Sequence, residues 1–389
     1  MSPVQSWPWP LDREATVAGV MSGTSCDGID VAVCRVAGSG ADVDLELLAF
    51  ETTPYEADLA EALRYYSNPL RAISAEVAEL DFRLGELMGQ AVARVASGRQ
   101  LDLIASHGHT VAHFPEGGAS LDTRCTRQVG SPAVITELAA VPVVSDFRSR
   151  DVAAGGQGAP LIPYADWCLL RDRAGADRAI VNLGGIANVT YLPGGDGPES
   201  LQRVLGFDTG PGNVVLNALA YKHDTALRCD PDGKLASQGK VNERLLAFLL
   251  RDEYYDRQPP KSAGRELFGE DLANRIPELR MTRKPREMLA TAVELIALTL
   301  TDAVKRFLPP VSSVYLCGGG THNRTLVGRI EALLGAPTRL TDDLGIPADA
   351  KEAIGFALLG SETMRGVPSN VPSVTGASGP RLLGSVTWP

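Results

Sequence analysis

The sequence is poor in positive charge and in histidine. Of its 389 residues, 37 are Lys or Arg against 47 Asp or Glu, which gives a net charge of −10, and only five are His. Proteins that bind nucleic acid or anionic membranes nonspecifically need a basic surface. No run of residues approaches the roughly 20 apolar positions of a membrane-spanning helix. We therefore expect a chain that binds no nucleic acid and no membrane.

The six cysteines lack the spacing of a zinc site or of paired thiols. No CxxC pair occurs, and several cysteines lie within apolar runs, as Cys34 does in "VAVCRVA". Free, buried thiols of a reducing compartment are favoured over disulfides. The first 15 residues have neither the basic segment nor the apolar core of a signal peptide. These features predict a soluble, cytoplasmic protein.

The chain is long enough for two domains, and 44% of it is hydrophobic. Glycine turns at strand ends occur in both halves, which predicts a duplicated α/β architecture with a cleft between two lobes. We expect a loose tail at 1–15, a first lobe at 16–147 that residues near 370–389 complete, and a second lobe at 148–369. Glycine and proline interrupt the pattern near this boundary, and the 154–158 segment is the expected hinge.

Local patterns within the first lobe predict individual elements. Residues 16–34 read as two strands joined by a glycine turn, and 73–95 have the spacing of an amphipathic helix. The strand that begins near Leu101 is expected to turn at Gly108–Thr110. Another strand is expected at 141–145.

The turn in "VMSGTSCDGIDVAV" has the glycines of a phosphate loop without the lysine of a P-loop. Backbone N–H groups in such a turn make an anion nest, and Thr24 and Ser25 add hydroxyl donors. Aspartates here suit Mg²⁺, which prefers oxygen ligands. A plain hairpin, with Asp27-Gly28 as its turn, explains the same residues. The residues alone leave both interpretations open.

Two later glycine turns also follow apolar strands. In "GFDTGPGN", Asp208 follows a bulky apolar residue at an expected strand end, a setting that suits a general base. Gly210 and Gly212 then open a helix whose N-terminus favours a phosphate. Asp208 as a simple helix cap is the alternative. "LCGGGTHN" lets a ligand approach the backbone closely, but it is neither a dinucleotide fingerprint nor a P-loop.

Polar residues that could contact a substrate occur in three further places. Three of the five histidines fall in "SHGHTVAH", where a metal site is possible but contacts to a hydroxylated substrate are favoured. The run "SDFRSRD" holds arginines that could pair with a substrate carboxylate, or it is a solvated loop. Glu352 begins an apolar helix, where an acid is ordinarily favoured by the helix dipole.

Eight ordered motifs resemble the anhydro-N-acetylmuramic acid kinase family, from about residue 17 to the end. They are "GVMSGTSCDGID", "SHGHT", "QVGSPAVI", "DFRSRDVAAGGQGAPLIP", "VNLGGIANV", "GFDTGPGN", "CGGGTHN" and "VTGASGPRLLG". The resemblance implies two RNase H-like lobes of the sugar kinase, hsp70 and actin type, with ATP in the interdomain cleft. It also implies a reaction of peptidoglycan recycling. ATP, Mg²⁺, water and 1,6-anhydro-N-acetylmuramic acid would give N-acetylmuramic acid 6-phosphate and ADP.

The resemblance assigns expected roles to individual residues. Asp208 would be the base that activates water. The sugar pocket would be lined by Ser106, His107, Gln128, Asp146, Arg148 and Glu352. Nucleotide binding would fall on Gly23, Thr24, Ser25, Cys26, Asp27, Gly28, Ile29, Asp30, Gly210, Gly212, Asn213, Gly318, Gly319 and Gly320. Mg²⁺ would be held through water by Asp27 and Asp30.

Two positions depart from the family's pattern. Cys26 stands where leucine or methionine is usual, and His109 stands where glutamine is expected. Two other functions stay open: a nonenzymatic nucleotide switch of the same fold, and a metal hydrolase built on the histidine cluster. We expect a small-molecule sugar as the substrate and a homodimer as the assembly.

Overall fold

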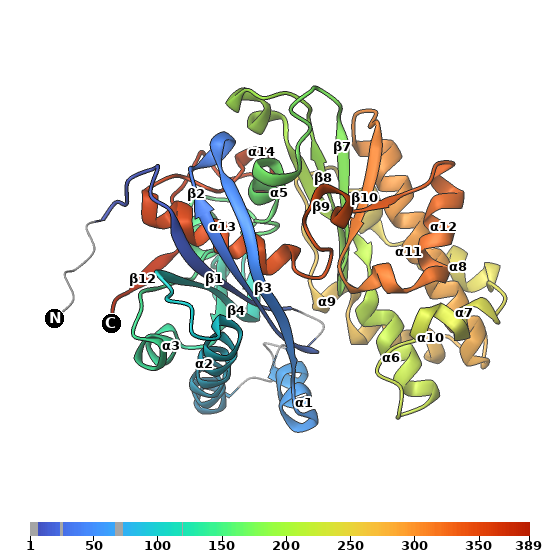
Figure 1. Ribbon diagram of the computed structural model, residues 1–389. Coiled ribbons are helices and arrows are strands. Elements are labelled where there is room, and N and C mark those ends of the chain that lie inside the picture. The colour runs from blue at the N-terminus through green and yellow to red at the C-terminus, as the bar shows by residue number, and fades with distance from the viewer. Residues whose placement is uncertain (1–6, 24–25, 67–72, 119) are drawn as a thin grey trace. The chain divides into compact units, whose positions relative to one another are not determined.

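The computed structural model describes residues 7–23, 26–66, 73–118 and 120–389, which form two compact units (Figure 1). Unit 1 comprises Met1–Arg171, Asp196–Val204 and Ala350–Pro389. Unit 2 comprises Asp172–Gly195 and Leu205–Asp349. Each unit has its own sheet and its own hydrophobic core.

Unit 1 is built on a seven-stranded sheet in the order β12-β6-β4-β1-β2-β3, with β5 paired to β4. Its strands are β1 (Ala15–Ser22), β2 (Gly28–Ala37), β3 (Asp44–Pro54), β4 (Leu103–Phe114), β5 (Cys125–Val129), β6 (Val143–Ser145) and β12 (Ser385–Thr387). Its α-helices are α1 (Ala57–Tyr66), α2 (Ser74–Ala96), α3 (Pro132–Ala139), α4 (Ser149–Ala153), α5 (Pro163–Leu170), α13 (Lys351–Arg365) and α14 (Pro372–Thr375).

Unit 2 is built on a five-stranded sheet in the order β11-β10-β7-β8-β9. Its strands are β7 (Arg178–Leu183), β8 (Ile186–Leu192), β9 (Leu205–Pro211), β10 (Ser313–Cys317) and β11 (Arg339–Leu340). Its α-helices are α6 (Asn213–His223), α7 (Lys234–Ser237), α8 (Glu243–Leu249), α9 (Arg265–Phe268), α10 (Glu270–Glu278), α11 (Pro285–Phe307) and α12 (Arg324–Leu334).

The two sheets repeat one topology. In unit 1, β1, β2 and β3 form an antiparallel meander, and β4 and β6 then add in parallel beside β1. In unit 2, β7, β8 and β9 form the same meander, and β10 and β11 add in parallel beside β7. This order is the RNase H-like arrangement, so the predicted α/β fold class and its duplication are confirmed.

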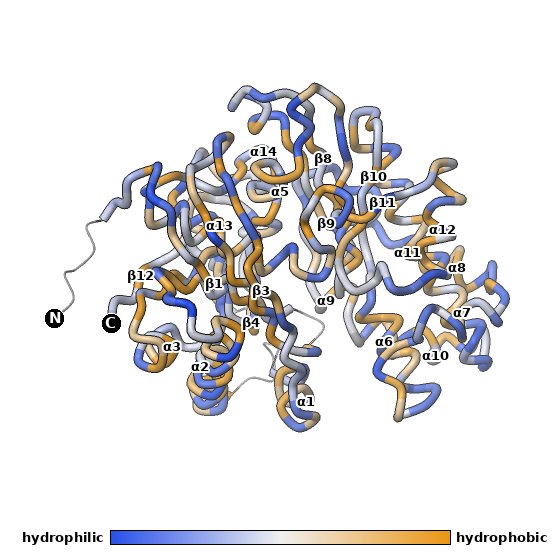
Figure 2. Tube along the Cα trace, viewed as in Figure 1, coloured by the Kyte–Doolittle hydropathy of each residue, from blue (hydrophilic) through white to orange (hydrophobic). Residues whose placement is uncertain are grey.

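Apolar residues are concentrated along the central strands and the helix faces that cover them (Figure 2). In unit 1, α2 buries Leu84 and Met88 against the sheet. Helix α13 lies unusually close to β1, because a Cβ built on Gly19 would sit 1.9 Å from the carbonyl oxygen of Ala353. Gly19 therefore permits this contact between helix and strand.

The division into units differs from the boundaries expected from sequence. Residues 148–171 and the long helix α13 belong to unit 1. The units therefore do not divide after residue 147 or after residue 369, where the sequence predicted the lobe boundaries. The 154–158 segment lies inside unit 1, where the N–H of Gln157 donates to Thr375 O at 2.7 Å and that of Gly158 to Asp151 Oδ2 at 2.8 Å. The prediction of a hinge between lobes at this segment is therefore wrong.

Part of the expected tail is packed on unit 1. The Trp9 side chain is buried, and its backbone N–H donates to Met364 O at 2.7 Å. The Arg13 guanidinium covers the Trp9 ring and pairs with Asp102 at 2.8 Å. The prediction of a loose tail is therefore wrong for the described residues 7–14, because an aromatic anchor holds them.

Strand β4 passes through the place where a turn was expected. Gly108 has φ +73°, but the strand continues to Phe114 with a register shift, and β5 pairs with its second half. The positive φ of Gly108 thus produces an irregularity within a strand. The structure also shows all six cysteines free, with Cys125 and Cys229 exposed and the other four buried. No helix among the described residues is long and apolar enough to span a membrane.

Candidate functional site

The first half of the candidate site is the hairpin between β1 and β2 of unit 1. Its turn closes with a hydrogen bond of 3.2 Å from the Cys26 N–H to Gly23 O, and Cys26 itself has φ +53°. Gly28 is required because a Cβ there would lie 2.4 Å from Thr53 O. Thr24 and Ser25, expected as hydroxyl donors, lie outside the described residues.

A chain of polar groups lies beneath this hairpin. The Tyr55 hydroxyl donates to Ser22 Oγ at 2.7 Å, and Ser22 Oγ is 2.9 Å from His109 Nδ1. Burial raises the pKa of Tyr55, so its hydroxyl stays a donor. The Ser22 hydrogen then goes to Nδ1, which leaves the Nε2 hydrogen of His109 facing Cys26 Sγ at 3.8 Å.

The two departures from the family's pattern are therefore neighbours. His109 connects Ser22, at the end of β1, with Cys26, just before β2. The sequence suggested that His109 contacts the sugar, but its two ring nitrogens face the hairpin. This geometry indicates a supporting role for His109 beneath the hairpin.

Asp27 and Asp30 place carboxylates at the start of β2. Asp30 Oδ1 accepts from the Thr52 hydroxyl at 2.6 Å, and Asp27 is exposed. Among the described residues no three His, Cys, Asp or Glu side chains gather as a metal site. Mg²⁺ bound with a nucleotide often takes only one or two carboxylates and keeps several waters. The donor set of these two aspartates therefore fits Mg²⁺ held through water.

The second part of unit 1's site joins β4 to the segment after β6. The Arg148 Nε–H donates to His107 Nε2 at 2.9 Å, and Arg148 also donates to Gly158 O at 2.8 Å. His107 Nδ1 donates to Gly108 O at 2.9 Å. Burial first, and then the Arg148 charge, hold the pKa of His107 well below its ordinary value. His107 is therefore a neutral imidazole of fixed orientation.

Gln128 and His113 extend this polar group along β5 and β4. The Gln128 amide donates to Thr126 Oγ1 at 2.9 Å, and His113 Nδ1 is 3.0 Å from the same oxygen. Burial and the Arg148 charge lower the pKa of His113 to about 3. Gln128 Oε1 is buried without a hydrogen-bond partner among the described residues. An unpaired buried acceptor of this kind suits a hydroxyl group of a ligand.

The structure does not bring every expected sugar contact into this group. Ser106 points the other way from β4 and donates to Met88 Sδ at 3.7 Å, within the core beneath α2. Asp146 is exposed, has φ +55° and accepts from the Ser149 hydroxyl at 2.5 Å. Glu352 is half-buried in the first turn of α13, within the same unit.

Sequence reasoning missed the role of Asp151. Its fully buried carboxylate accepts hydrogen bonds of 2.8 Å from the Gly158 N–H, the Asn370 amide and the Thr375 hydroxyl. Gly158 in turn accepts from Arg148. Asp151 thus fixes the loop that orients Arg148. The one sequence feature that could have indicated this role is the position of Asp151, four residues before the glycine-rich stretch that begins at Gly155.

Asp208 is the main feature of unit 2's site. It lies within β9, which continues to Pro211, so it is not at the strand end as expected. Only 8% of the residue is exposed, and its Oδ2 accepts from the Ala263 N–H at 2.8 Å. The Tyr254 hydroxyl donates to Asp208 O at 2.8 Å. The carboxylate is therefore partly desolvated and held in one orientation from a distant loop.

Lys261 anchors that loop and was not found from the sequence. Its Nζ donates to the carbonyl oxygens of Tyr254 and Tyr255 at 3.2 and 3.3 Å, and it lies 4.8 Å from the ring centres of Tyr254 and Phe307. Burial is the main cause that lowers the pKa of Lys261 to about 8. The sequence "PPKSAG" contains no local pattern that predicts a buried lysine at position 261.

The two glycine turns of unit 2 meet at the hairpin between β7 and β8. A Cβ on Gly212 would lie 2.5 Å from Gly184 O, and one on Gly320 would lie 2.6 Å from Leu183 Cβ. Asn213 donates through its amide to Leu183 O at 2.8 Å, and Gly318 has φ +80°. The predicted glycines at 210–212 and 318–320 are thus gathered around one hairpin. Gly319 is exposed and has open space around it, whereas Gly210, Gly212 and Gly320 are buried.

Comparisons with known proteins agree on one family. The sequence profile of the family described as anhydro-N-acetylmuramic acid kinase matches residues 15–389. The chain is 42% identical over 387 residues to the anhydro-N-acetylmuramic acid kinase of Salinibacter ruber, with 96% of each chain covered. It is 40% identical over 389 residues to that of Caldanaerobacter subterraneus, covering 96% of this chain and 97% of the relative.

The solved structures that resemble the chain are distant. The activator of the 2-hydroxyisocaproyl-CoA dehydratase from Clostridium difficile, with bound ADPNP, covers 90% of this chain and 96% of its own. Its TM-score is 0.44 and its sequence identity is 12%.

Proposed function

Since the chain belongs to the anhydro-N-acetylmuramic acid kinase family, we propose that it phosphorylates 1,6-anhydro-N-acetylmuramic acid while opening the anhydro bond with water. The products are N-acetylmuramic acid 6-phosphate and ADP. Water adds its oxygen to C1, the bond between C1 and O6 breaks, and O6 attacks the γ-phosphorus of ATP. This reaction serves the recycling of peptidoglycan fragments in the cytoplasm.

The observation that carries the mechanism is the setting of Asp208. Its carboxylate is nearly buried, and the Ala263 N–H holds one of its oxygens. A carboxylate in this setting is a natural acceptor for a proton from the attacking water. A fixed base supplies orientation as well as proton transfer, and phosphoryl transfer itself needs mainly positioning and charge neutralisation.

Each unit contains glycine turns that are assigned to nucleotide binding. In unit 1 the glycine turn between β1 and β2 is the proposed phosphate loop, and His109 supports it from beneath. In unit 2 the turns at 210–213 and 318–320 surround the β7–β8 hairpin. Asp27 and Asp30 would hold Mg²⁺, which neutralises phosphate charge when bound.

The sugar contacts are assigned to unit 1. Neutral His107 and the Arg148 guanidinium provide a polar pair, and Arg148 suits the lactyl carboxylate of a muramic acid. Gln128 Oε1 is a buried acceptor without a partner among the described side chains. Glu352 and Asp146 complete the assignment, while Ser106 supports the core instead.

Two other functions are less well supported. A metal hydrolase would need a ligand cluster, and the described residues form none of three or more His, Cys, Asp or Glu. A nonenzymatic nucleotide switch would not need a buried, oriented carboxylate such as that of Asp208.

A coupled assay tests the proposed substrate. ADP release is measured with 1,6-anhydro-N-acetylmuramic acid, with N-acetylmuramic acid and without sugar. We expect rapid release only with the anhydro sugar, together with one equivalent of a 6-phosphorylated product. Equal release with N-acetylmuramic acid would show a conventional sugar kinase instead.

A further inference from the structure

Unit 2 has a cavity, open to solvent, beside the N-terminal end of α11. The cavity has a volume of about 530 Å³ and is lined by His223, Lys240, Arg283, Lys284, Arg286 and Glu287. These residues come from the C-terminus of α6, the chain after α7 and the start of α11. Sites for small molecules span about 300–1,000 Å³, so this cavity has a suitable size.

The charge around this basic pocket is unbalanced. Four cationic side chains line it, against the one carboxylate of Glu287. That carboxylate is already occupied, because Lys284 Nζ donates to it at 2.8 Å and the Thr282 hydroxyl at 2.7 Å. The same two groups, with the charge of Lys240, lower the pKa of Glu287.

The remaining cations have no direct hydrogen-bond or ion-pair partner among the described side chains. Within that part of the chain, Lys240, Arg283 and Arg286 make no hydrogen bond or ion pair through their side chains. Such a group of positive charges contrasts with the net charge of −10 of the whole chain. Like charges held together repel one another, so an anion placed among them would be favourable.

The backbone of the pocket is held in place without a ligand. A Cβ on Gly239 would lie 2.0 Å from Arg286 O, so the chain after α7 packs directly on the first turn of α11. Two bonds continue this attachment, from the Asn242 N–H to Thr291 Oγ1 at 2.9 Å and from the Asn242 amide to Met281 O at 3.2 Å. The backbone from which the exposed cationic side chains project is therefore held in place.

The basic pocket is separate from Asp208. Gly210, two residues beyond Asp208, packs against Thr299 of α11, since a Cβ there would lie 3.1 Å from Thr299 Oγ1. An α-helix rises about 1.5 Å per residue, so Thr299 is about 20 Å along α11 from Pro285 at the pocket. An anion in the pocket is thus too far away to be the phosphoryl group in transfer.

We propose that the basic pocket is an accessory binding site for a small phosphorylated anion. An arginine guanidinium can donate two parallel hydrogen bonds to phosphate oxygens, and a lysine ammonium adds a localised positive charge. The volume leaves room for an organic group or a second phosphate beside the first. The site goes beyond the proposed kinase reaction and does not depend on its substrate.

Histidine NMR locates binding within the full-length chain. The protein has five His residues, of which His223 lines the basic pocket and His322 adjoins the glycine turn at 318–320. With ¹³C-labelled histidine, each ring gives one resolvable signal, assigned by His223→Gln and His322→Gln. Pyrophosphate without Mg²⁺ is the probe. We expect saturable movement of the His223 signal, with and without saturating ADP.

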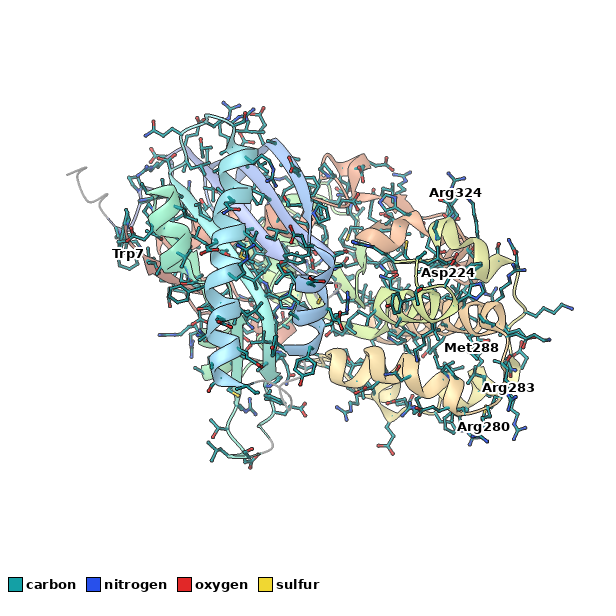
Figure 3. The ribbon with its side chains drawn as sticks, turned by 90° about the horizontal axis from the view of Figure 1, so that it is seen from below. Trp7, Asp224, Arg280, Arg283, Met288 and Arg324 are labelled. Atoms are coloured by element: carbon teal, nitrogen blue, oxygen red, sulfur yellow. The ribbon has the colours of Figure 1, made fainter. Side chains whose placement is uncertain are left out.

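Charge variants provide the matched control. Arg280 and Arg283 both project from the helical edge of unit 2 (Figure 3), but Arg280 does not line the cavity. The double variant Lys240→Ala/Arg286→Ala should weaken the pyrophosphate Kd read at His223 at least tenfold. Arg280→Ala should change it less than twofold.

Three results would overturn the proposal. The His223 signal could stay still, the double variant could bind as the wild type does, or ADP could abolish the His223 response. The last result would make the cavity an extension of the nucleotide site. Asp208→Asn separates this proposal from the proposed function. The variant should lose kinase activity in the coupled assay, while pyrophosphate should still move the His223 signal.

Discussion

At the scale of single residues, the candidate site depends on groups that orient other groups. Asp208 is oriented by the Ala263 N–H, and Arg148 is oriented through Gly158 by the buried Asp151. His109 joins Ser22 to Cys26. Ala263 is 55 residues from Asp208, and His109 is 87 residues from Ser22, so a local motif does not reveal these positioning contacts. Asp151 is close to Arg148 in the sequence, but it acts through Gly158.

Replacing Asp208 with Asn should remove turnover while leaving nucleotide binding. The amide has nearly the same shape and its oxygen can still accept from the Ala263 N–H, but it cannot take a proton from water. General base catalysis contributes about 10²–10⁴-fold, so kcat should fall by a factor in that range. The Kd for ADP, measured by calorimetry, should change less than threefold. A kcat near the wild-type value would remove Asp208 from the role of base.

Tyr254→Phe should reduce kcat modestly by loosening Asp208. The change removes only the hydroxyl that donates to Asp208 O, and a hydrogen bond of this kind contributes about 0.5–1.5 kcal/mol. We expect kcat to fall about 2- to 10-fold with an unchanged KM for ATP. Tyr255→Phe is the matched control, because the Tyr255 ring stacks on Phe268 and would be kept. Equal losses in the two variants would argue against positioning through Tyr254.

At the scale of elements, the glycine-rich turns and their flanking strands could be predicted from the sequence. Each consists of a short apolar run followed by residues that favour a turn. Neighbouring residues alone are therefore enough to predict it. The predicted turn at Gly108 was wrong for a reason that is not local. Pairing of β4 with β5 keeps the chain extended beyond that glycine. The short strand β5 itself was not anticipated.

Packing between α13 and β1 gives a stability prediction with an internal control. Gly19→Ala would place a methyl group 1.9 Å from Ala353 O, so the helix must move. Such overpacking typically costs about 1–3 kcal/mol of unfolding free energy. Gly328→Ala, within α12, meets nothing within 4 Å and should stabilise by about 0.5–1 kcal/mol. Urea denaturation measures both, and a Gly19→Ala variant as stable as wild type would contradict the close contact.

At the scale of the whole molecule, the duplication could be predicted but the limits of the units could not. Repeated strand-and-turn patterns indicated two related lobes. Helix α13 lies near the end of the sequence but belongs to unit 1. The Trp9 N–H donates a hydrogen bond to Met364 O in that helix. Such long-range contacts depend on the folded arrangement, which composition near residue 150 does not reveal.

Two buried histidines should make the folded protein sensitive to acid. The pKa of His107 is held well below 6.5 and that of His113 at about 3, mainly by burial. Below about pH 6.5 the unfolded chain therefore binds protons that the folded chain does not, and the free energy of unfolding falls as the pH falls. Urea midpoints from pH 7 to pH 4 measure this fall. It should be shallower for His113→Asn, and a parallel profile would contradict the neutral state of His113.

Incorporation of oxygen from water tests the hydrolytic kinase reaction most directly. The enzyme is incubated with ATP, Mg²⁺ and 1,6-anhydro-N-acetylmuramic acid in ¹⁸O-water, and the product is examined by mass spectrometry and by ¹³C NMR at early times. The account predicts one ¹⁸O atom at C1 of N-acetylmuramic acid 6-phosphate and none in the phosphate. A 6-phosphorylated product without label at C1, or label in the phosphate, would contradict it.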